Sequence, residues 1–194
     1  MAYAAGCTFL PCLCAVANVE AALEPERAQE LRVAYVGPQL LAADHLVADF
    51  DCGQAALNDW LKRRALGNQQ SGTTRTWVVT ETGSHEVIAF YASCTGSILR
   101  STAPKRIGQG QPEQLPAWLL ARMGVDQKHQ GRGVGAALLK HFVLKALELS
   151  ASVGVRLLLV HAKDDEAKSF YEHYGFVESP IDALTMMMLL PAGA

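Results

Sequence analysis

The sequence has no apolar run long enough to span a membrane and no paired cysteine motif. An uninterrupted stretch of about 18 apolar residues would predict a transmembrane helix, and none occurs in the 194 residues. The five cysteines are an odd number without a Cys-x-x-Cys pair, which argues against a disulfide framework and a zinc site. We therefore expect a cytoplasmic protein with reduced thiols and no bound metal ion.

Internal repeats and low-complexity segments are also absent, and half of the residues are hydrophobic. This composition supports a substantial core and excludes a mainly disordered or coiled-coil protein. Residues 1–19 are apolar but lack the Lys or Arg that begins a secretory signal; a weak signal-like segment is the alternative. We predict a poorly ordered N-terminal extension over residues 1–32 and one domain over residues 33–194.

Charges are distributed unevenly along a chain whose formal net charge is -2. Residues 61–132 contain ten Lys or Arg and four acidic residues, whereas residues 163–182 contain two Lys and six acidic residues. Such an asymmetry forms solvated faces of opposite sign or provides a basic surface for an anionic partner. Charge alone does not decide between these two interpretations.

Hydrophobic periodicity predicts strands and helices in mixed order from residue 33 onward. Helices are expected over residues 53–67, 133–149 and 164–174, and strands over 74–80, 87–93, 118–125, 156–161 and 185–190. The first helix has Asp51 as candidate N-cap and ends at Gly67, the first two strands form a hairpin, and residues 101–116 form a loop. This order predicts an α+β fold, a mixed α/β sandwich.

Glycines alternate with other residues over 130–135, where a predicted helix follows a predicted strand. Glycine lets the backbone approach a ligand closely, and the first amides of a helix carry partial positive charge, so the turn suits a phosphate. Lys128 and Arg132 add cationic donors. The Gly-Lys-Ser/Thr ending of a Walker loop and the G-x-G-x-x-G spacing of a dinucleotide-binding fold are absent. Glycines that serve only tight helix packing are the structural alternative.

Gln130-x-x-Gly133-x-Gly135 fits the Q/R-x-x-G-x-G/A pyrophosphate motif of the GNAT acetyltransferase superfamily, and residues 167–176 resemble the A-x-x-F-Y-x-x-x-G-F helix and turn of that family. The resemblance covers residues 33–191. It implies a central mixed, mostly antiparallel sheet that is splayed at the acetyl-CoA site and has helices on both faces. It also implies acetyl-CoA as co-substrate, without a metal, at Met123, Gly124, Val125, Lys128, Gln130, Gly131, Arg132, Gly133, Val134, Gly135, Ala136, Lys168 and Phe170.

The chain is most similar to the acetyltransferase toxins of toxin–antitoxin modules. The segments that carry this similarity are Asp49–Gly53, Leu57–Leu61, Arg75–Val79, Leu120–Asp126 and Val160–Lys163. The resemblance implies acetylation of the α-amino group of aminoacyl-tRNA, inhibition of translation, a ribbon–helix–helix antitoxin as partner, and a homodimer. Gly124 departs from the family pattern, which often has a larger residue there.

Transfer of an acetyl group to an amine requires a polarised carbonyl and a proton for the leaving sulfur. We expect the N–H of Val125 to contact the carbonyl, and Tyr171 to be the acid, because a phenol with a pKa of about 10 is protonated at pH 7. By resemblance, Tyr171 occupies the family's catalytic tyrosine position. Packing of Tyr171 against the sheet, Tyr174 as the acid, and His161 as a base are the alternatives.

If the acceptor is an aminoacyl-tRNA, the basic residues of segment 61–132 could bind its phosphate backbone, because cationic side chains contact phosphates without reading the sequence. The candidate tRNA-binding residues are Lys62, Arg63, Arg64, Arg75, Arg100, Lys105 and Arg106. Two other functions stay open: an N-acetyltransferase for a small amine, peptide or protein N-terminus, and a non-catalytic acetyl-CoA-binding partner of a DNA-binding antitoxin.

Overall fold

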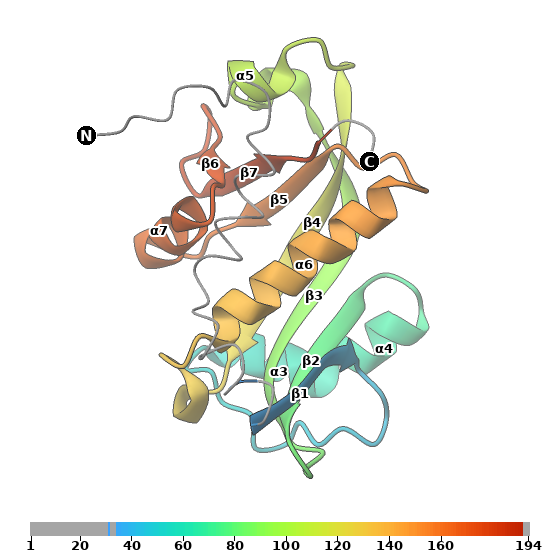
Figure 1. Ribbon diagram of the computed structural model, residues 1–194, viewed down its shortest axis with the longest axis vertical. Helices are drawn as coiled ribbons and strands as arrows, with labels where there is room; N and C mark the ends of the chain where they lie inside the picture. Colours follow the sequence, from blue (N-terminus) through green and yellow to red (C-terminus); the bar gives the residue numbers. More distant parts are fainter. Residues whose placement is uncertain (1–30, 32–33, 192–194) are drawn as a thin grey trace, which may run out of the picture.

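Seven strands form one continuous sheet in the computed structural model, which describes Leu31 and residues 34–191 (Figure 1). They are β1 (Tyr35–Leu40), β2 (Arg75–Glu81), β3 (Val87–Leu99), β4 (Gln114–Val125), β5 (Leu157–His161), β6 (Val177–Glu178) and β7 (Thr185–Leu189). Their order across the sheet is β1-β2-β3-β4-β5-β7-β6. Only β4 and β5 pair in parallel among these strands. The expected mixed, mostly antiparallel sheet is confirmed. The predicted extension over residues 1–32 lies outside the described residues, apart from Leu31.

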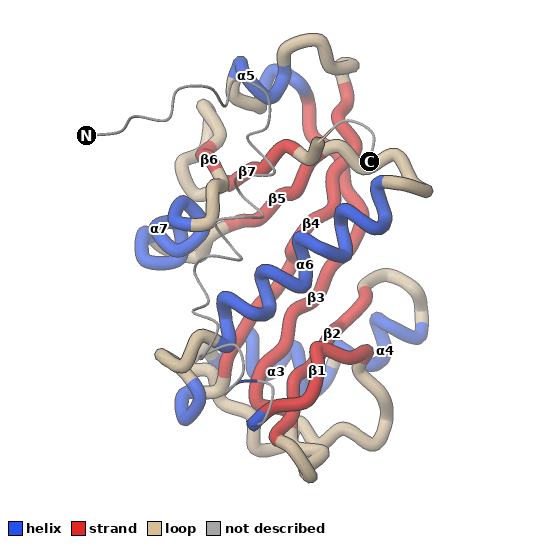
Figure 2. The backbone as a smooth tube through the Cα atoms, viewed as in Figure 1, coloured by secondary structure: helices blue, strands red, loops and turns tan. Residues whose placement is uncertain are grey.

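Helices cover both faces of the sheet, as expected (Figure 2). They are α3 (Ala55–Arg63), α4 (Ala65–Gln70), α5 (Lys105–Gly108), α6 (Val134–Ser150) and α7 (Asp165–His173), with short 3₁₀ turns at Arg100–Thr102 and Gln127–His129. The long helix α6 crosses one face and buries Leu138 and Phe142 against it. The opposite face carries α3 and α4, where Trp60 and Leu61 are buried. No described helix is both long and apolar enough to cross a membrane.

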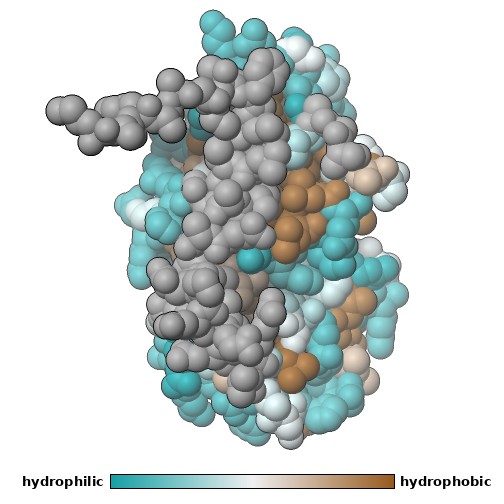
Figure 3. Space-filling view, viewed as in Figure 1, coloured by the Kyte–Doolittle hydropathy of each residue, from teal (hydrophilic) through white to brown (hydrophobic). Residues whose placement is uncertain are grey.

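Hydrophobic side chains fill the space between these layers rather than the surface. Among the described residues on the face shown in Figure 3, polar residues form most of the surface, and hydrophobic ones gather near its middle, over α6. Leu149 and Val153, at the end of α6 and just beyond it, are among the exposed apolar residues.

Three features of the fold differ from the sequence prediction. The second strand of the hairpin continues to Leu99 and pairs with residues from Gln114 onward, so the expected loop over 101–116 is shorter and contains α5. The periodicity did not predict β1, because this edge strand has no regular alternation of buried and exposed positions. Gly67 does not end a helix; it lies within α4 because the chain breaks helical geometry at Arg64 and resumes it at once.

The predicted N-cap at Asp51 was wrong. Gln54 precedes α3 and makes no side-chain cap. The Asp51 carboxylate instead accepts hydrogen bonds from the N–H of Gly53 at 2.8 Å and the side-chain amides of Asn58 at 2.7 Å and Gln127 at 3.0 Å. These donors favour the charged form and lower the pKa of Asp51 below its ordinary value. The aspartate therefore ties the loop before α3 to the turn after β4.

A histidine on α6 should make the stability of the fold depend on pH. The hydroxyl of buried Tyr91 lies 2.9 Å from Nδ1 of His141, and burial, with a smaller effect of Lys145, lowers the pKa of His141 to about 4. Because the unfolded chain binds this proton near pH 6.5 and the folded chain does not, stability should fall between about pH 6.5 and 4. Urea midpoints across this range should fall less for His141→Gln. An equal fall in both proteins would contradict this role.

Candidate active site

Two neighbouring strands diverge where the predicted site residues lie. The parallel pairing of β4 with β5 runs from Ala117 opposite Leu157 to Leu120 opposite Val160 and then stops, although β4 continues to Val125. The divergence begins at a bulge, because Ser93 pairs with Leu120 and Ala92 with Arg122, which leaves Ala121 unpaired. A bulge of this kind bends a strand and increases its twist. The expected splay of the sheet is therefore present and has a local cause.

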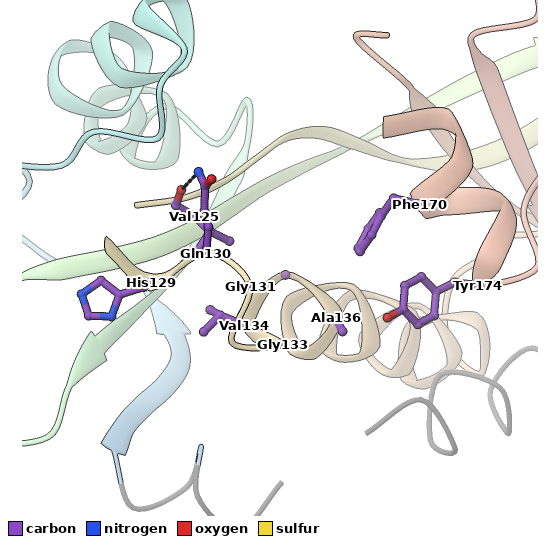
Figure 4. Close-up of a pocket in the computed structure, with 10 residues that line it drawn as sticks. Val125, His129, Gln130, Gly131, Gly133, Val134, Ala136, Phe170 and Tyr174 are labelled. Carbon is purple, nitrogen blue, oxygen red and sulfur yellow. Dashed lines mark hydrogen bonds between the residues drawn. The ribbon is translucent and has the colours of Figure 1, made fainter. Parts of the chain in front are cut away.

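The backbone of β4 beyond the bulge points polar groups into this opening. The N–H of Asp126 donates to the carbonyl of Ile88 at 2.8 Å. In an antiparallel ladder, successive residues turn their polar groups to opposite sides, so the N–H and carbonyl of Val125 face away from β3. The side-chain amide of Gln130 donates to that carbonyl at 2.9 Å (Figure 4). The N–H of Val125 is thus directed to the open edge.

A cavity of about 340 Å³, called here the smaller cavity, lies at the start of α6. Gly133 is the N-cap residue and has φ +87°, a left-handed conformation that other residues rarely adopt. The turn before it directs the first amides of the helix toward the cavity, which suits an anion. Phe170 on α7 and Tyr174 directly after this helix point toward α6 (Figure 4). The lining residues are Val125, His129, Gln130, Gly131, Gly133, Val134, Gly135, Ala136, Phe170 and Tyr174.

A second cavity of about 510 Å³, the larger cavity, occupies the space between the diverging strands. It shares Val125, Gln130, Gly135 and Phe170 with the smaller cavity, so the two adjoin. Its other lining residues are Cys52, Gly53, Gln54, Leu57, Leu120, Ala121, Arg122, Met123, Gly124, Gln127, Val160, His161, Lys163, Glu166, Ala167 and Tyr171. The two cavities together form one continuous site.

Most predicted cofactor residues line these two cavities, but three do not. Lys128 and Arg132 are exposed beside the smaller cavity, and Arg132 reaches the hydroxyl of Tyr35 at 3.5 Å. Lys168 is held away by Glu178, at 2.5 Å, and lies 3.8 Å from Glu172. Binding of the cofactor by these three residues stays a prediction, with Lys168 the least favourably placed.

Tyr171 is buried and lines the larger cavity from α7. Its surroundings raise the pKa of its phenol above the ordinary value, because burial disfavours the phenolate. Among the described residues, its hydroxyl has no hydrogen-bond partner. A protonated, unpartnered phenol in a cavity wall is suited to donate a proton there.

The two alternatives to Tyr171 are less well placed for that role. Tyr174 lines only the smaller cavity, beside the start of α6. His161 lines the larger cavity, but its Nδ1 lies 2.9 Å from the hydroxyl of Thr185, which in turn donates to Asp182 at 2.6 Å. This chain of hydrogen bonds gives His161 a structural partner. Among the residues that the structure describes, no cluster of three or more His, Cys, Asp or Glu could hold a metal ion.

Sequence reasoning assigned no role to one wall of the larger cavity, formed by Cys52, Gly53, Gln54 and Leu57. This loop is joined to the turn after β4, because the N–H of Asp51 donates to the Asp126 carboxylate at 2.9 Å and the N–H of Gln127 donates to the Asp51 carbonyl at 2.9 Å. The toxin-like segment Asp49–Gly53 was the available signal. Its distance from β4 along the chain concealed the contact.

Neighbouring side chains fill the space that a larger residue would occupy at Gly124. An added Cβ would lie 3.1 Å from the ring of Phe90 and 3.3 Å from the sulfur of Cys52. Both contacts are tighter than ordinary van der Waals distance, so a larger residue would require Phe90 or Cys52 to move. The packing of Phe90 and Cys52 therefore suits a glycine at position 124, where the family often has a larger residue.

The predicted tRNA-binding cations are all exposed but form two separate groups. The first group lies on α3, at the break after it and on β2, and consists of Lys62, Arg63, Arg64 and Arg75. The second group, Arg100, Lys105 and Arg106, lies near α5, at the other end of the molecule (Figure 1). Some already have protein partners, which are Asp59 for Arg63, the Gln69 carbonyl for Arg75 and the Gln111 carbonyl for Arg100. They do not form one continuous basic surface, and their role stays a prediction.

Comparison with known proteins agrees with this arrangement. The model of the acetyltransferase (GNAT) domain family matches residues 72–178. The tRNA-acetylating toxin of Mycobacterium tuberculosis (strain ATCC 25618 / H37Rv) is 38% identical over 156 residues, which cover 80% of this chain and 93% of the relative. The solved structure of AtaT complexed with acetyl-methionyl-tRNAfMet is similar, with a TM-score of 0.74 and 26% sequence identity. The matched region covers 78% of this chain and 92% of the AtaT chain. The structure of AtaTR bound with acetyl-CoA has a TM-score of 0.70 and 25% sequence identity, and the match covers 80% of this chain and 94% of the chain in that structure.

Proposed function

The chain belongs to the GNAT acetyltransferase family, and we propose that it is a toxin that acetylates the α-amino group of aminoacyl-tRNA and so blocks translation. Acetyl-CoA is the proposed donor. The sequence similarity to a tRNA-acetylating toxin, which extends over most of both chains, supports the choice of acceptor. The resemblance to the toxin family also underlies the proposed effect on translation.

The open edge of β4 between the two cavities is the observation that carries this proposal. The main-chain amides at the start of α6 suit a diphosphate, and the unpaired edge around Met123 and Val125 offers hydrogen bonds to an extended, amide-containing arm. The residues present therefore fit acetyl-CoA. When bound, acetyl-CoA supplies an acetyl group that is activated as a thioester.

The residues of the larger cavity can perform the remaining tasks. The N–H of Val125 donates a hydrogen bond toward the carbonyl oxygen and stabilises negative charge there. Tyr171 holds its proton and donates it to the departing sulfur. An α-amino group with an ordinary pKa of about 7.7–8.0 is partly neutral near pH 7, so its attack does not require a strong base from the protein. The nitrogen then loses one proton to water, which balances the proton that Tyr171 gives to the sulfur.

The charges around the larger cavity favour an anionic acceptor over a cationic one. Arg122 and Lys163 line this cavity, and Glu166 is the one carboxylate among its lining residues. Lys163 pairs with Asp164 at 3.2 Å, so Arg122 is the cation of this cavity that a ligand would meet without a carboxylate partner among the described residues. A site for a small polyamine would instead be rich in carboxylates. This balance favours a charged tRNA over small amines, the second candidate acceptors.

The test is mass spectrometry of products after incubation with acetyl-CoA. Charged tRNAs are compared with a panel of small amines and peptides under identical conditions. Acetylated aminoacyl-tRNA would support the proposal, whereas acetylation confined to small amines or peptides would replace it with an ordinary N-acetyltransferase. No product from any acceptor would favour an acetyl-CoA-binding partner of an antitoxin.

The toxin resemblance also leads us to propose a ribbon–helix–helix antitoxin as partner, a homodimer, a cytoplasmic location and a catalytic domain over residues 33–194.

Co-expression with the product of a neighbouring gene for a small DNA-binding protein should restore growth that the toxin alone arrests. Light scattering of the purified chain should give the mass of a dimer. Growth arrest that persists with every adjacent gene would contradict the antitoxin proposal.

A further inference from the structure

Arg122 occupies its place in the larger cavity because of the bulge in β4. Side chains alternate between the two faces of a strand, so a regular strand would direct Leu120 and Arg122 to the same face. The bulge at Ala121 changes this: Leu120 packs in the core cluster beneath α6, whereas Arg122 lies over Trp60 of α3, on the opposite face. The same irregularity that opens the cavity therefore brings a guanidinium into its wall.

The guanidinium is held by an aromatic ring and not by an acid. Its central carbon lies 4.7 Å from the ring centroid of Trp60, which is itself buried. Among the described residues, it has no carboxylate within ion-pair distance and no hydrogen bond from its side chain. Stacking on an indole fixes the plane of a guanidinium but leaves its N–H donors available. Arg122 is therefore oriented and unsatisfied, in contrast to Arg63, which pairs with Asp59 at 2.7 Å.

An oriented guanidinium with free donors is suited to a phosphate or carboxylate, which accepts two parallel hydrogen bonds. Arg122 lines the larger cavity together with Tyr171 and is not among the lining residues of the smaller cavity at the start of α6, where the amides suit a diphosphate. An anion bound by Arg122 would then be part of the acceptor. In an aminoacyl-tRNA, the first anion beyond the ester-linked amino acid is the phosphodiester of the terminal nucleotide.

Building on the function proposed above, we propose that Arg122 binds the terminal phosphodiester of the charged tRNA and so positions the α-amino group at the active site. The role is one of binding and orientation, since the residue does not take part in bond making. It makes a charged tRNA a better acceptor than a free amino acid derivative that has no phosphate.

The test compares charged tRNA with the amide of the same amino acid, which has the α-amino group but no phosphate. Because a hydrogen-bonded charge pair is lost, Arg122→Gln should lower kcat/KM for charged tRNA, relative to the amide, by about 10- to 100-fold. The change should lie mainly in KM. Arg122→Lys, which keeps the charge but loses the planar fork, should recover part of the preference.

A salt titration gives a readout that a purely structural role would not change. Loss of one phosphate contact should reduce the slope of log(kcat/KM) against log of salt concentration by roughly 0.7. Lys145→Gln is the matched control, because Lys145 also lies over a tryptophan, Trp77 at 5.7 Å, but outside both cavities. It should change neither the preference nor the slope.

The possible outcomes separate this inference from the proposed function. If the native protein acetylates charged tRNA and Arg122→Gln keeps its full preference and salt slope, the role of Arg122 is wrong and the function stands. If Arg122→Gln weakens both acceptors equally, together with acetyl-CoA binding, its effect is structural and the inference is also wrong. If the native protein does not acetylate charged tRNA, the proposed function itself fails.

Discussion

Replacement of Tyr171 by Phe should lower kcat by roughly 100- to 10,000-fold, the usual contribution of a general acid. The change removes only the hydroxyl, and the ring keeps its place against Phe176, with which it is in edge-to-face contact. The affinity for acetyl-CoA, measured by calorimetry, should therefore be nearly unchanged. Steady-state rates with the identified acceptor measure the loss of turnover.

Tyr174→Phe is the matched control, since the same atom is removed one helical turn away on a ring that lines only the smaller cavity. Its loss of kcat should be much smaller. Because burial raises the pKa of Tyr171 above its ordinary value, its ionisation should not reduce activity at any pH below about 10. Full activity of Tyr171→Phe would remove this residue from the mechanism.

Replacement of Gly135 by Asp should weaken acetyl-CoA binding by roughly 100-fold or more. Gly135 lines both cavities in the first turn of α6, so the new carboxylate would lie where the helix amides attract a diphosphate. At a separation of about 5 Å, two like charges near a protein surface repel by about 3 kcal/mol. Calorimetric titration with acetyl-CoA gives the change in Kd.

Two variants separate repulsion from damage to the fold. A Cβ at position 135 would make only ordinary contacts, 3.8 Å from Val125 and 4.0 Å from Phe170, so Gly135→Ala should fold normally and bind acetyl-CoA far better than the aspartate variant. Gly154→Asp adds the same charge in the loop beyond the other end of α6, where a Cβ would have no neighbour within 4 Å. It should bind normally. Normal affinity in Gly135→Asp would refute the phosphate-binding role of this turn.

Local sequence patterns determined the parts of the site that lie within one continuous segment. The strand, glycine turn and helix over 118–149 were predictable because close backbone approach and helix amides are properties of neighbouring residues. The same is true of Tyr171, whose helix starts with Asp164 as N-cap, its carboxylate accepting from the N–H of Ala167 at 2.9 Å. The family resemblance assigned roles to these segments.

Contacts between distant segments were decided only by the tertiary structure. The bulge at Ala121 depends on the register between β3 and β4, and it decides that Arg122 faces Trp60. The loop at Asp51 meets the turn at Asp126 although 75 residues separate them along the chain. Strand register and loop docking depend on how whole faces pack together, and that information is not contained in the periodicity of any one segment.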